Sequence, residues 1–198
     1  MTTVTEIPVD RARQSEVVNA LAAFLPDGAV LYEREDVQPY ECDGLSAYRQ
    51  LPMVVTLPET EEQVQRILQT CHELRTPVVA RGAGTGLSGG ALPLGNGVLV
   101  RSRVSWGCSR SIRSRTMRVQ PGVRNLAISE AAYPYRLYYA PDPSSQIACS
   151  IGGNVAENAG GMHCLKYGLT VHNILKLRAY TITGELLEIG AEALDAAG

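Results

Sequence analysis

The sequence predicts an α/β fold made of two successive units, and three observations lead to this prediction. Short β-branched strand patterns alternate with amphipathic helix patterns along the chain. Gly and Pro residues stand where one pattern gives way to the next. With 198 residues, 45% of them hydrophobic, and a net charge of −2, the chain can build a core for one large domain or two small ones.

The first unit is predicted to follow an N-terminal helix over residues 10–25, which ends at the turn residues 26–28. Thr60 and Gln63 form a capping-box pattern, because each side chain can accept a hydrogen bond from a free N–H near the other. The helix opened there should stop at Thr76 and Pro77. Together with its strands this makes a βαββ unit, the strands being expected at residues 53–57, 77–80 and 98–100.

The second unit is predicted to begin near residues 118–122. It should contain a helix over 123–132, a strand over 137–140 and a terminal hairpin whose turn includes Thr183 and Gly184. The hairpin strands are expected at residues 175–182 and 186–189.

A glycine-rich loop follows the strand at 77–80, with five glycines among residues 82–90. Glycine permits φ > 0 and leaves no Cβ in front of the backbone amides, so several N–H groups can converge on one anion. Residues 74–129 hold no Asp or Glu but nine Arg, so an anion meets no repulsion from this stretch. The loop is therefore predicted to bind phosphate, and the alternative is a tight turn without a ligand.

Elimination narrows the kind of phosphate site. Residues 84–89 read GxGxxG, but a Rossmann site needs a helix after the glycines and an acidic residue about 20 positions on. Pro93 and its neighbouring glycines stop a helix here, and the next carboxylate is Glu130. A Walker A loop is excluded because no GK[ST] follows. A pyrophosphate held by backbone amides outside both folds remains.

A second restricted stretch covers residues 139–161. Pro141 and Pro143 fix the backbone around Asp142, and serines and paired glycines follow. Such a backbone often lines a ligand, although a Pro/Gly loop before a helix N-terminus would look the same. Since an extended dinucleotide needs several contact segments, both stretches are predicted to serve one ligand.

No metal site is predicted, because the three His and five Cys residues show neither HxxxH nor CxxC spacing. Reduced thiols are expected. The N-terminus lacks a signal-peptide pattern and no run of 18 apolar residues occurs, so the cytoplasm is predicted and a membrane span is not.

Four stretches of the chain resemble a known family. RGAGTGLSGGA, VQPGV, YYAPDPSSQIACSIGGNVAENAGG and HCLKYGLT are similar to the PCMH-type FAD-binding domain of the vanillyl-alcohol oxidase superfamily. Within it they look most like the family that contains the FAD-binding component of bacterial glycolate oxidase and its D-lactate dehydrogenase relatives. The resemblance spans about residues 30–190. It implies a helical lead-in at 1–50, a first FAD-binding subdomain at 51–104 and an incomplete second subdomain at 105–198, with FAD between the subdomains.

The resemblance also implies the cofactor contacts. One group matches the family's pyrophosphate loop: Arg81, Gly82, Gly84, Thr85, Gly86, Leu87, Ser88, Gly89 and Gly90. A second matches the segment near the flavin ring: Pro141, Asp142, Ser144 and Ser145. A third matches the stretch around the flavin and its ribityl chain: Ser150, Gly152, Gly153, Asn154, Asn158, Gly160 and Gly161. Tyr167 and Gly168 match a further contact.

Noncovalent FAD is implied, because the first loop lacks the His that carries a covalent flavin in other members. The implied reaction is oxidation of a 2-hydroxy acid such as glycolate or D-lactate, with other glycolate oxidase subunits as partners that could hold the protein at the inner membrane. The family's substrate-binding residues lie in a cap domain that this chain is expected to lack, so no catalytic residue is assigned. The alternative is a noncatalytic flavin-binding remnant of a truncated gene.

Residues 102–117, rich in Arg and Ser, depart from the family pattern although both flanks match it. A local reading-frame error is the favoured interpretation. A solvated loop and a basic nucleic-acid or membrane-surface patch are the alternatives, and nucleic-acid binding is not expected because no helical stripe organises the arginines.

Overall fold

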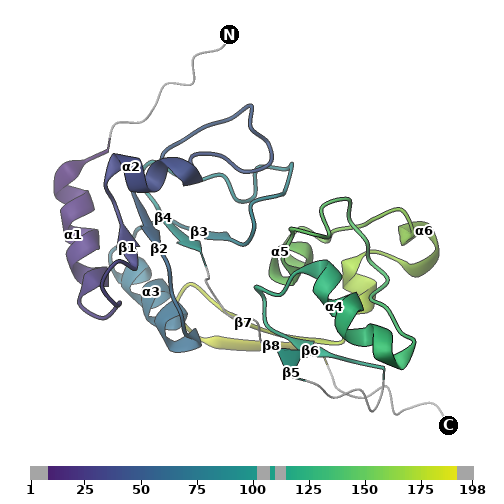
Figure 1. Ribbon diagram of the computed structural model, residues 1–198. Helices are drawn as coiled ribbons and strands as arrows, with labels where there is room; N and C mark the ends of the chain where they lie inside the picture. Colours follow the sequence, from purple (N-terminus) through teal and green to yellow (C-terminus); the bar gives the residue numbers. More distant parts are fainter. Residues whose placement is uncertain (1–8, 102–107, 110–114, 191–198) are drawn as a thin grey trace.

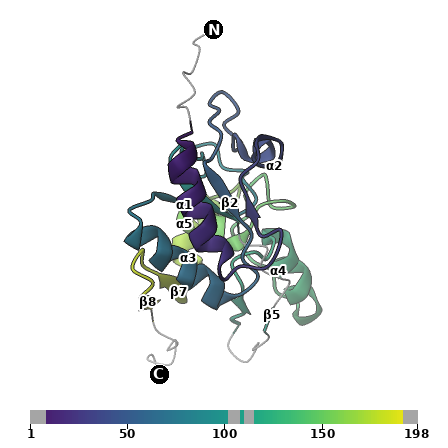
Figure 2. The same ribbon diagram turned by 90° about the vertical axis from the view of Figure 1, so that its left-hand side faces the viewer.

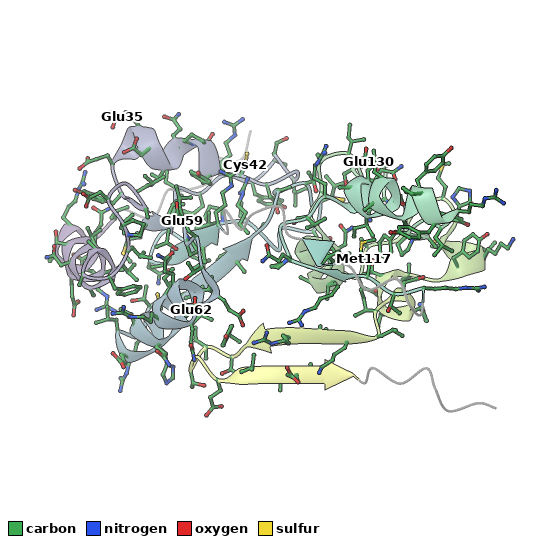
Figure 3. The ribbon with its side chains drawn as sticks, turned by 60° about the horizontal axis from the view of Figure 1, so that its bottom comes forward. Glu35, Cys42, Glu59, Glu62, Met117 and Glu130 are labelled. Atoms are coloured by element: carbon green, nitrogen blue, oxygen red, sulfur yellow. The ribbon has the colours of Figure 1, made fainter. Side chains whose placement is uncertain are left out.

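The computed structural model describes residues 9–101, 108–109 and 115–190 (Figure 1). Most of the stretch at 102–117 lies outside these residues, so its interpretation as a frame error stays a prediction. The described residues form two neighbouring units, and a long β-hairpin runs along both of them (Figures 1 and 3).

A four-stranded sheet organises the first unit, with strand order β1-β2-β4-β3. The three strands β2, β3 and β4 run parallel, while β1 pairs antiparallel with β2. The crossover from β2 through helix α3 to β3 leaves room for β4 between them, which confirms the predicted βαββ unit. The strands are β1 (Val30–Leu31), β2 (Val54–Thr56), β3 (Val78–Arg81) and β4 (Val98–Arg101).

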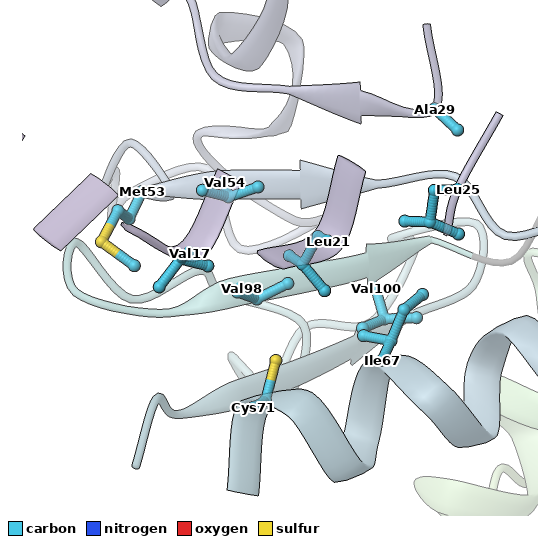
Figure 4. Packing of buried hydrophobic residues seen from close by; sticks show 10 residues of the cluster. All are labelled: Val17, Leu21, Leu25, Ala29, Met53, Val54, Ile67, Cys71, Val98 and Val100. Atoms are coloured by element: carbon cyan, nitrogen blue, oxygen red, sulfur yellow. The ribbon is translucent and has the colours of Figure 1, made fainter. Parts of the chain in front are cut away.

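Two helices cover one face of this sheet, α1 (Arg11–Ala22) and α3 (Glu61–Glu73) (Figure 2). Both present residues spaced three or four apart to the sheet, and these side chains are almost fully buried. These helix side chains pack against alternate residues of strands β2 and β4 (Figure 4). The helices contribute Val17 and Leu21 of α1 and Ile67 and Cys71 of α3, and the strands contribute Val54, Val98 and Val100. This core includes α1, so residues N-terminal to β2 contribute to it.

The opposite face is also buried. Val55 and Leu99 point there and pack with Val37 and Leu51. The short helices α2 (Arg34–Val37) and η1 (Gln38–Tyr40) lie in the segment that covers this side. Because both faces are covered, the parallel strands are apolar except for their last residues Thr56, Arg81 and Arg101, as is usual for parallel strands.

Helix α3 begins as its sequence predicts. Thr60 Oγ1 accepts a hydrogen bond from Gln63 N at 3.2 Å, and Gln63 Oε1 accepts one from Thr60 N at 3.4 Å. The capping box is therefore confirmed.

The second unit contains short helices around a smaller core made by Val123, Ile128 and Ile151. A two-stranded ribbon of β5 and β6 lies beside them. Its elements are β5 (Cys108–Ser109), β6 (Arg118–Val119), α4 (Asn125–Ala132), η2 (Tyr133–Tyr135), α5 (Ile151–Ala156), α6 (Cys164–Tyr167) and η3 (Thr170–Asn173).

The predicted strand at 137–140 is wrong. Within the described part of the chain those residues pair with no strand, and Tyr139 N instead donates to Ser129 Oγ of α4 at 2.9 Å. A side chain of the neighbouring helix thus satisfies the backbone where a strand would have needed a ladder.

The predicted terminal hairpin is confirmed as β7 (Lys176–Tyr180) and β8 (Leu186–Gly190). It docks on α3 of the first unit. Arg178 Nη2 lies 2.9 Å from Glu61 Oε1, which also accepts a hydrogen bond from Tyr180 Oη at 2.7 Å. Gln65 Nε2 donates to the carbonyl oxygen of Gly184 at 2.7 Å. The hairpin therefore links the two units.

Candidate functional site

The glycine loop leaves the carboxyl end of β3, the edge strand of the parallel sheet. Gly84 and Gly89 have φ of 70° and 76°, a region that favours glycine. At Gly86, apart from its two chain neighbours, no atom of the described residues lies within 4 Å of the position that a Cβ would take. A ligand on this side can therefore approach the Gly86 backbone without meeting a side chain.

Arg81, the last residue of β3, is half-buried beneath this loop. Its Nη1 donates to the carbonyl oxygen of Cys42 at 2.7 Å and lies 3.4 Å from that of Ala91. The guanidinium also sits 5.9 Å from the ring centre of Tyr40. Burial lowers the pKa of Arg81, and the nearby Asp43 carboxylate opposes that shift. The sequence placed Arg81 among the ligand contacts, and the structure places its side chain among loop carbonyls.

The segment that contains Cys42 and Gly44, N-terminal to β2, packs against the glycine loop. A Cβ on Gly44 would lie 2.7 Å from the carbonyl oxygen of Gly86 and 2.8 Å from that of Thr85. Only glycine allows this approach without movement of the loop. Cys42, labelled in Figure 3, belongs to the same segment.

The second unit meets the loop from the other side. A Cβ on Gly82 would collide with Ser150 Oγ, and one on Gly90 would collide with the Glu157 carboxylate. Ser150 precedes helix α5 and Glu157 follows it. Two of the predicted contact stretches, far apart in sequence, are therefore neighbours in space.

This arrangement corrects the charge prediction. Residues 74–129 hold no acidic side chain, but the fold brings the carboxylates of Glu157 and Asp43 to the loop from other parts of the chain. These two carboxylates therefore repel an anion that approaches the loop. The Arg81 guanidinium interacts with the Asp43 carboxylate and offsets part of this repulsion.

Asn154 offers an unused hydrogen-bond donor. Its side chain is 3% exposed, and among the described residues its Nδ2 finds no acceptor. A buried amide group without a partner costs roughly 1–3 kcal/mol, so such groups usually mark a missing ligand or water. Asn154 lies on α5 in the stretch predicted to wrap a flavin.

The segment that follows Pro141 is tied to the neighbouring chain. Asn125 Nδ2 donates to the Pro141 carbonyl oxygen at 3.0 Å. Asp142 Oδ2 lies 2.6 Å from His163 Nδ1, and this contact lowers the pKa of Asp142. A Cβ on Gly161 would collide with the Asp142 backbone. Asp142 and Gly161, predicted separately, thus touch one another.

Tyr167 and Gly168 lie at the end of α6. The Tyr167 ring meets Tyr138 edge to face, with centroids 6.1 Å apart and an interplanar angle of 86°. The pKa of Tyr167 is lowered by a hydrogen bond with Tyr138 and by the nearby Lys166 ammonium. Gly168 has φ of 79° and lies against the His172 ring, so only glycine fits easily there.

The other predicted residues have mostly structural surroundings. Gly152 packs on Pro121, Gly160 packs on Leu169, and Asn158 Oδ1 accepts a hydrogen bond from Val171 N at 3.0 Å. Ser145 O accepts bonds from two backbone N–H groups and closes a turn. A Cβ on Gly153 would lie 3.5 Å from Ser150 Oγ, an ordinary van der Waals contact. Six of the predicted residues are exposed: Leu87, Ser88, Gly90, Ser144, Asn158 and Tyr167.

Sequence reasoning missed six residues at the site: Tyr40, Cys42, Asp43, Gly44, Glu157 and His163. Glu157 and His163 stand inside the motifs that carried the family resemblance, so their place in those motifs was a usable signal. Tyr40 and Gly44 lie in the predicted lead-in, where no pattern marks them. Over the stretches that the structure describes, no helix is long and apolar enough to cross a membrane.

Comparison with known proteins bears on this geometry directly. A family model described as "FAD binding domain" matches residues 52–190. The chain belongs to this FAD-binding family. The matched range holds the glycine loop, α5 and the Asp142 and Tyr167 segments, but it begins after Cys42 and Gly44.

Relatives within the family include glycolate oxidase subunit GlcD of Escherichia coli K12, which is 61% identical over 96% of this chain. GlcD of Bacillus subtilis is 37% identical over 80% of this chain, and a D-lactate dehydrogenase of Anaerostipes hadrus is 32% identical over 82%. The chain spans only 38%, 34% and 34% of the length of these relatives. It is thus homologous to the FAD-binding portion of GlcD and of D-lactate dehydrogenases.

Solved structures support the fold. An alkyldihydroxyacetonephosphate synthase aligns with a TM-score of 0.75 at 20% identity, over 94% of this chain and 35% of its own. Phl p 4.0202, a glucose dehydrogenase, aligns with a TM-score of 0.74 at 16% identity, over 88% of this chain and 38% of its own. The α/β fold is therefore that of the FAD-binding region of larger flavoenzymes, as predicted.

Proposed function

We propose that this chain binds FAD noncovalently and is the FAD-binding portion of a flavin-dependent 2-hydroxy-acid dehydrogenase or oxidase subunit. One observation carries the proposal, namely the bare glycine loop at the end of a parallel strand, with helix α5 of the second unit against it. An extended ligand that lies where the glycine loop meets α5 can contact both of them. The subdomain limits at residues 51–104 and 105–198 belong to the same proposal.

The residues present fit FAD in two respects. The Cβ direction of Gly86 points into space that none of the described residues fills, so a pyrophosphate can approach the loop backbone there. Asn154 carries a buried Nδ2 without an acceptor among the described residues, and FAD is rich in acceptor oxygens. Both features lie in stretches that the family match includes.

The chain's own residues would bind and orient the cofactor. The loop amides from Gly82 to Gly90 would hold the pyrophosphate, and Ser150 and Asn154 of the α5 region would hold the ribityl and flavin parts. Asp142 and Tyr167 would border the flavin ring. When bound, FAD supplies a hydride acceptor, and the protein's contribution is to position it. No His stands in residues 81–90, which favours noncovalent binding.

Substrate and partners are proposed from the relatives. Since these are named glycolate oxidase subunit GlcD and D-lactate dehydrogenase, we expect a small 2-hydroxy acid such as glycolate or D-lactate as substrate of the whole protein. Because GlcD is named as a subunit, we expect the whole protein to assemble with further subunits. A cytoplasmic location, with attachment to the inner membrane through those subunits, remains a prediction. No residue of this chain is assigned a catalytic role.

The test is a titration of the purified chain with FAD, FMN and ADP, followed by flavin fluorescence and calorimetry. FAD and ADP are expected to bind, and FAD should bind more tightly than FMN, because the loop grips the adenosine diphosphate half. Equal affinities for FAD and FMN would refute the pyrophosphate assignment. Binding of FAD without turnover of glycolate or D-lactate in the whole protein would favour the noncatalytic alternative.

A further inference from the structure

The glycine loop depends on residues upstream of the family match. That match begins at residue 52. Tyr40, Cys42 and Gly44 precede it, yet each lies against Arg81 or the loop. The loop is therefore enclosed by a segment about forty residues earlier in the chain.

Arg81 is the link between that segment and the loop. Its Nη1 donates to Cys42 O at 2.7 Å and approaches Ala91 O, just after the last loop glycine, at 3.4 Å. Its guanidinium lies so close to Gly84 that a Cβ there would be 2.8 Å from Cζ. The loop thus wraps around the guanidinium, and the positive φ of Gly84 serves this wrapping.

We propose that Arg81 is a positioning residue that orders the glycine loop by joining its end to the segment 40–44, so that this segment is part of the cofactor site. The inference rests on the proposed FAD function and specifies how the loop is held. The sequence resemblance only placed Arg81 within the pyrophosphate loop, and the proposal assigns its guanidinium a role in holding that loop.

The physical need for such a residue follows from the loop's composition. Glycine loses more backbone freedom on ordering than any other residue, so a loop of five glycines is costly to hold in one conformation. Hydrogen bonds from a charged donor are stronger than neutral ones, and a planar guanidinium can bond while stacking on a ring. Arg81 uses both contacts. A loop ordered before FAD arrives binds it more tightly, because less entropy is lost on binding.

Arg101 provides a matched control. It pairs with Arg81 in register on the neighbouring strand β4. Its guanidinium also lies over Tyr40, at 5.7 Å from the ring centre, and Nη1 donates to Tyr40 Oη at 3.3 Å. Arg101→Met therefore removes an equivalent charge and aromatic contact without touching the carbonyls of Cys42 and Ala91.

The experiment measures loop order and FAD affinity separately in Arg81→Met, Arg81→Lys and Arg101→Met. Loop order is read in the FAD-free chain by thermolysin cleavage at Leu87, which is 71% exposed. Arg81→Met should be cleaved about tenfold faster and bind FAD about tenfold to a hundredfold more weakly, as expected for a lost charged hydrogen bond. Arg81→Lys should recover part of both effects, and Arg101→Met should match the wild type.

Two results would overturn the proposal. Weaker FAD binding with unchanged cleavage would mean that Arg81 contacts the phosphate rather than the loop. Equal effects of Arg81→Met and Arg101→Met would mean that the charge or the Tyr40 contact matters, and not the hydrogen bonds to the carbonyls of Cys42 and Ala91. If the wild type binds no FAD, the proposed function fails, yet the cleavage rates still test whether Arg81 orders the loop.

A second variant covers the case in which Arg81→Met does not fold. Gly44→Ala leaves Arg81 intact but places a Cβ 2.7 Å from Gly86 O. It should push the loop away from the segment 40–44 and weaken FAD binding about tenfold. Normal FAD affinity in a folded Gly44→Ala chain would remove this segment from the site.

Discussion

Substitution of Gly86 separates the fold of the glycine loop from its ligand. Apart from its chain neighbours, no residue that the structure describes comes within 4 Å of a Cβ at this position, and φ is outside the left-handed region. Gly86→Ala is therefore expected to change the free energy of unfolding by less than about 1 kcal/mol, and any gain would come through the unfolded state. Gly86→Val adds an isopropyl group on the open side, where the pyrophosphate is proposed to lie.

The expected loss is in binding. A hydrogen bond between a backbone amide and a charged acceptor contributes about 1.5–3 kcal/mol, so displacing one phosphate contact should weaken FAD binding about tenfold to a hundredfold. The assay is FAD fluorescence titration beside thermal unfolding of the FAD-free chain. Gly86→Ala should lie between the wild type and Gly86→Val.

Gly28→Ala is the control. Gly28 lies in the turn before β1 with φ of 77°, so alanine there is strained by on the order of 1 kcal/mol. It should lower stability without changing FAD affinity, the opposite of Gly86→Val. Wild-type FAD affinity in Gly86→Val would refute the assignment of the loop to phosphate.

Three further predictions concern the rest of the chain. Thr60→Ala removes the capping box of α3 and should lower the free energy of unfolding by about 1 kcal/mol in urea titrations. Burial raises the pKa of Cys71 to about 11, so alkylation at pH 8 should be much slower at Cys71 than at the half-buried Cys164, as followed by peptide mass spectrometry. His163→Ala should raise the pKa of Asp142 toward its ordinary value, measured by carboxyl NMR titration. Because the lowered pKa stabilises the fold only above the carboxyl's unfolded pKa, the stability gap between wild type and His163→Ala should close as pH falls through the folded pKa.

Each of these has a clear contrary result. Unchanged stability in Thr60→Ala would mean that the cap contributes nothing, and equal alkylation rates would mean that Cys71 is accessible. An Asp142 pKa that does not move in His163→Ala would mean that another group lowers it.

Local chemistry explains what the sequence predicted well. The start of α3 follows from Thr60 and Gln63, which lie three residues apart and satisfy each other whatever surrounds them. The glycine loop was likewise visible, because five glycines after a strand are a local signal. The strand expected at 137–140 does not form, because the backbone of Tyr139 bonds to the Ser129 side chain of helix α4 and not to another strand.

The arrangement around the loop could not be read from spacing. Arg81 bonds to Cys42, 39 positions earlier, and Gly90 lies against Glu157 in the other unit. Residues 74–129 around Arg81 contain no acidic residue, which suggested that an anion would meet no repulsion from this stretch. Only the folded chain brings carbonyl oxygens and carboxylates to it.

The docking of the terminal hairpin on α3 has a consequence for the order in which this protein matures. Arg178 and Glu61 are 117 positions apart, and contacts that close so long a loop form late in folding. During synthesis the sheet of the first unit can assemble before the hairpin has been synthesised. We therefore expect that a nascent chain without β7 and β8 forms its glycine loop but not the contact between this loop and α5. It should bind a dinucleotide only after β7 and β8 have been synthesised.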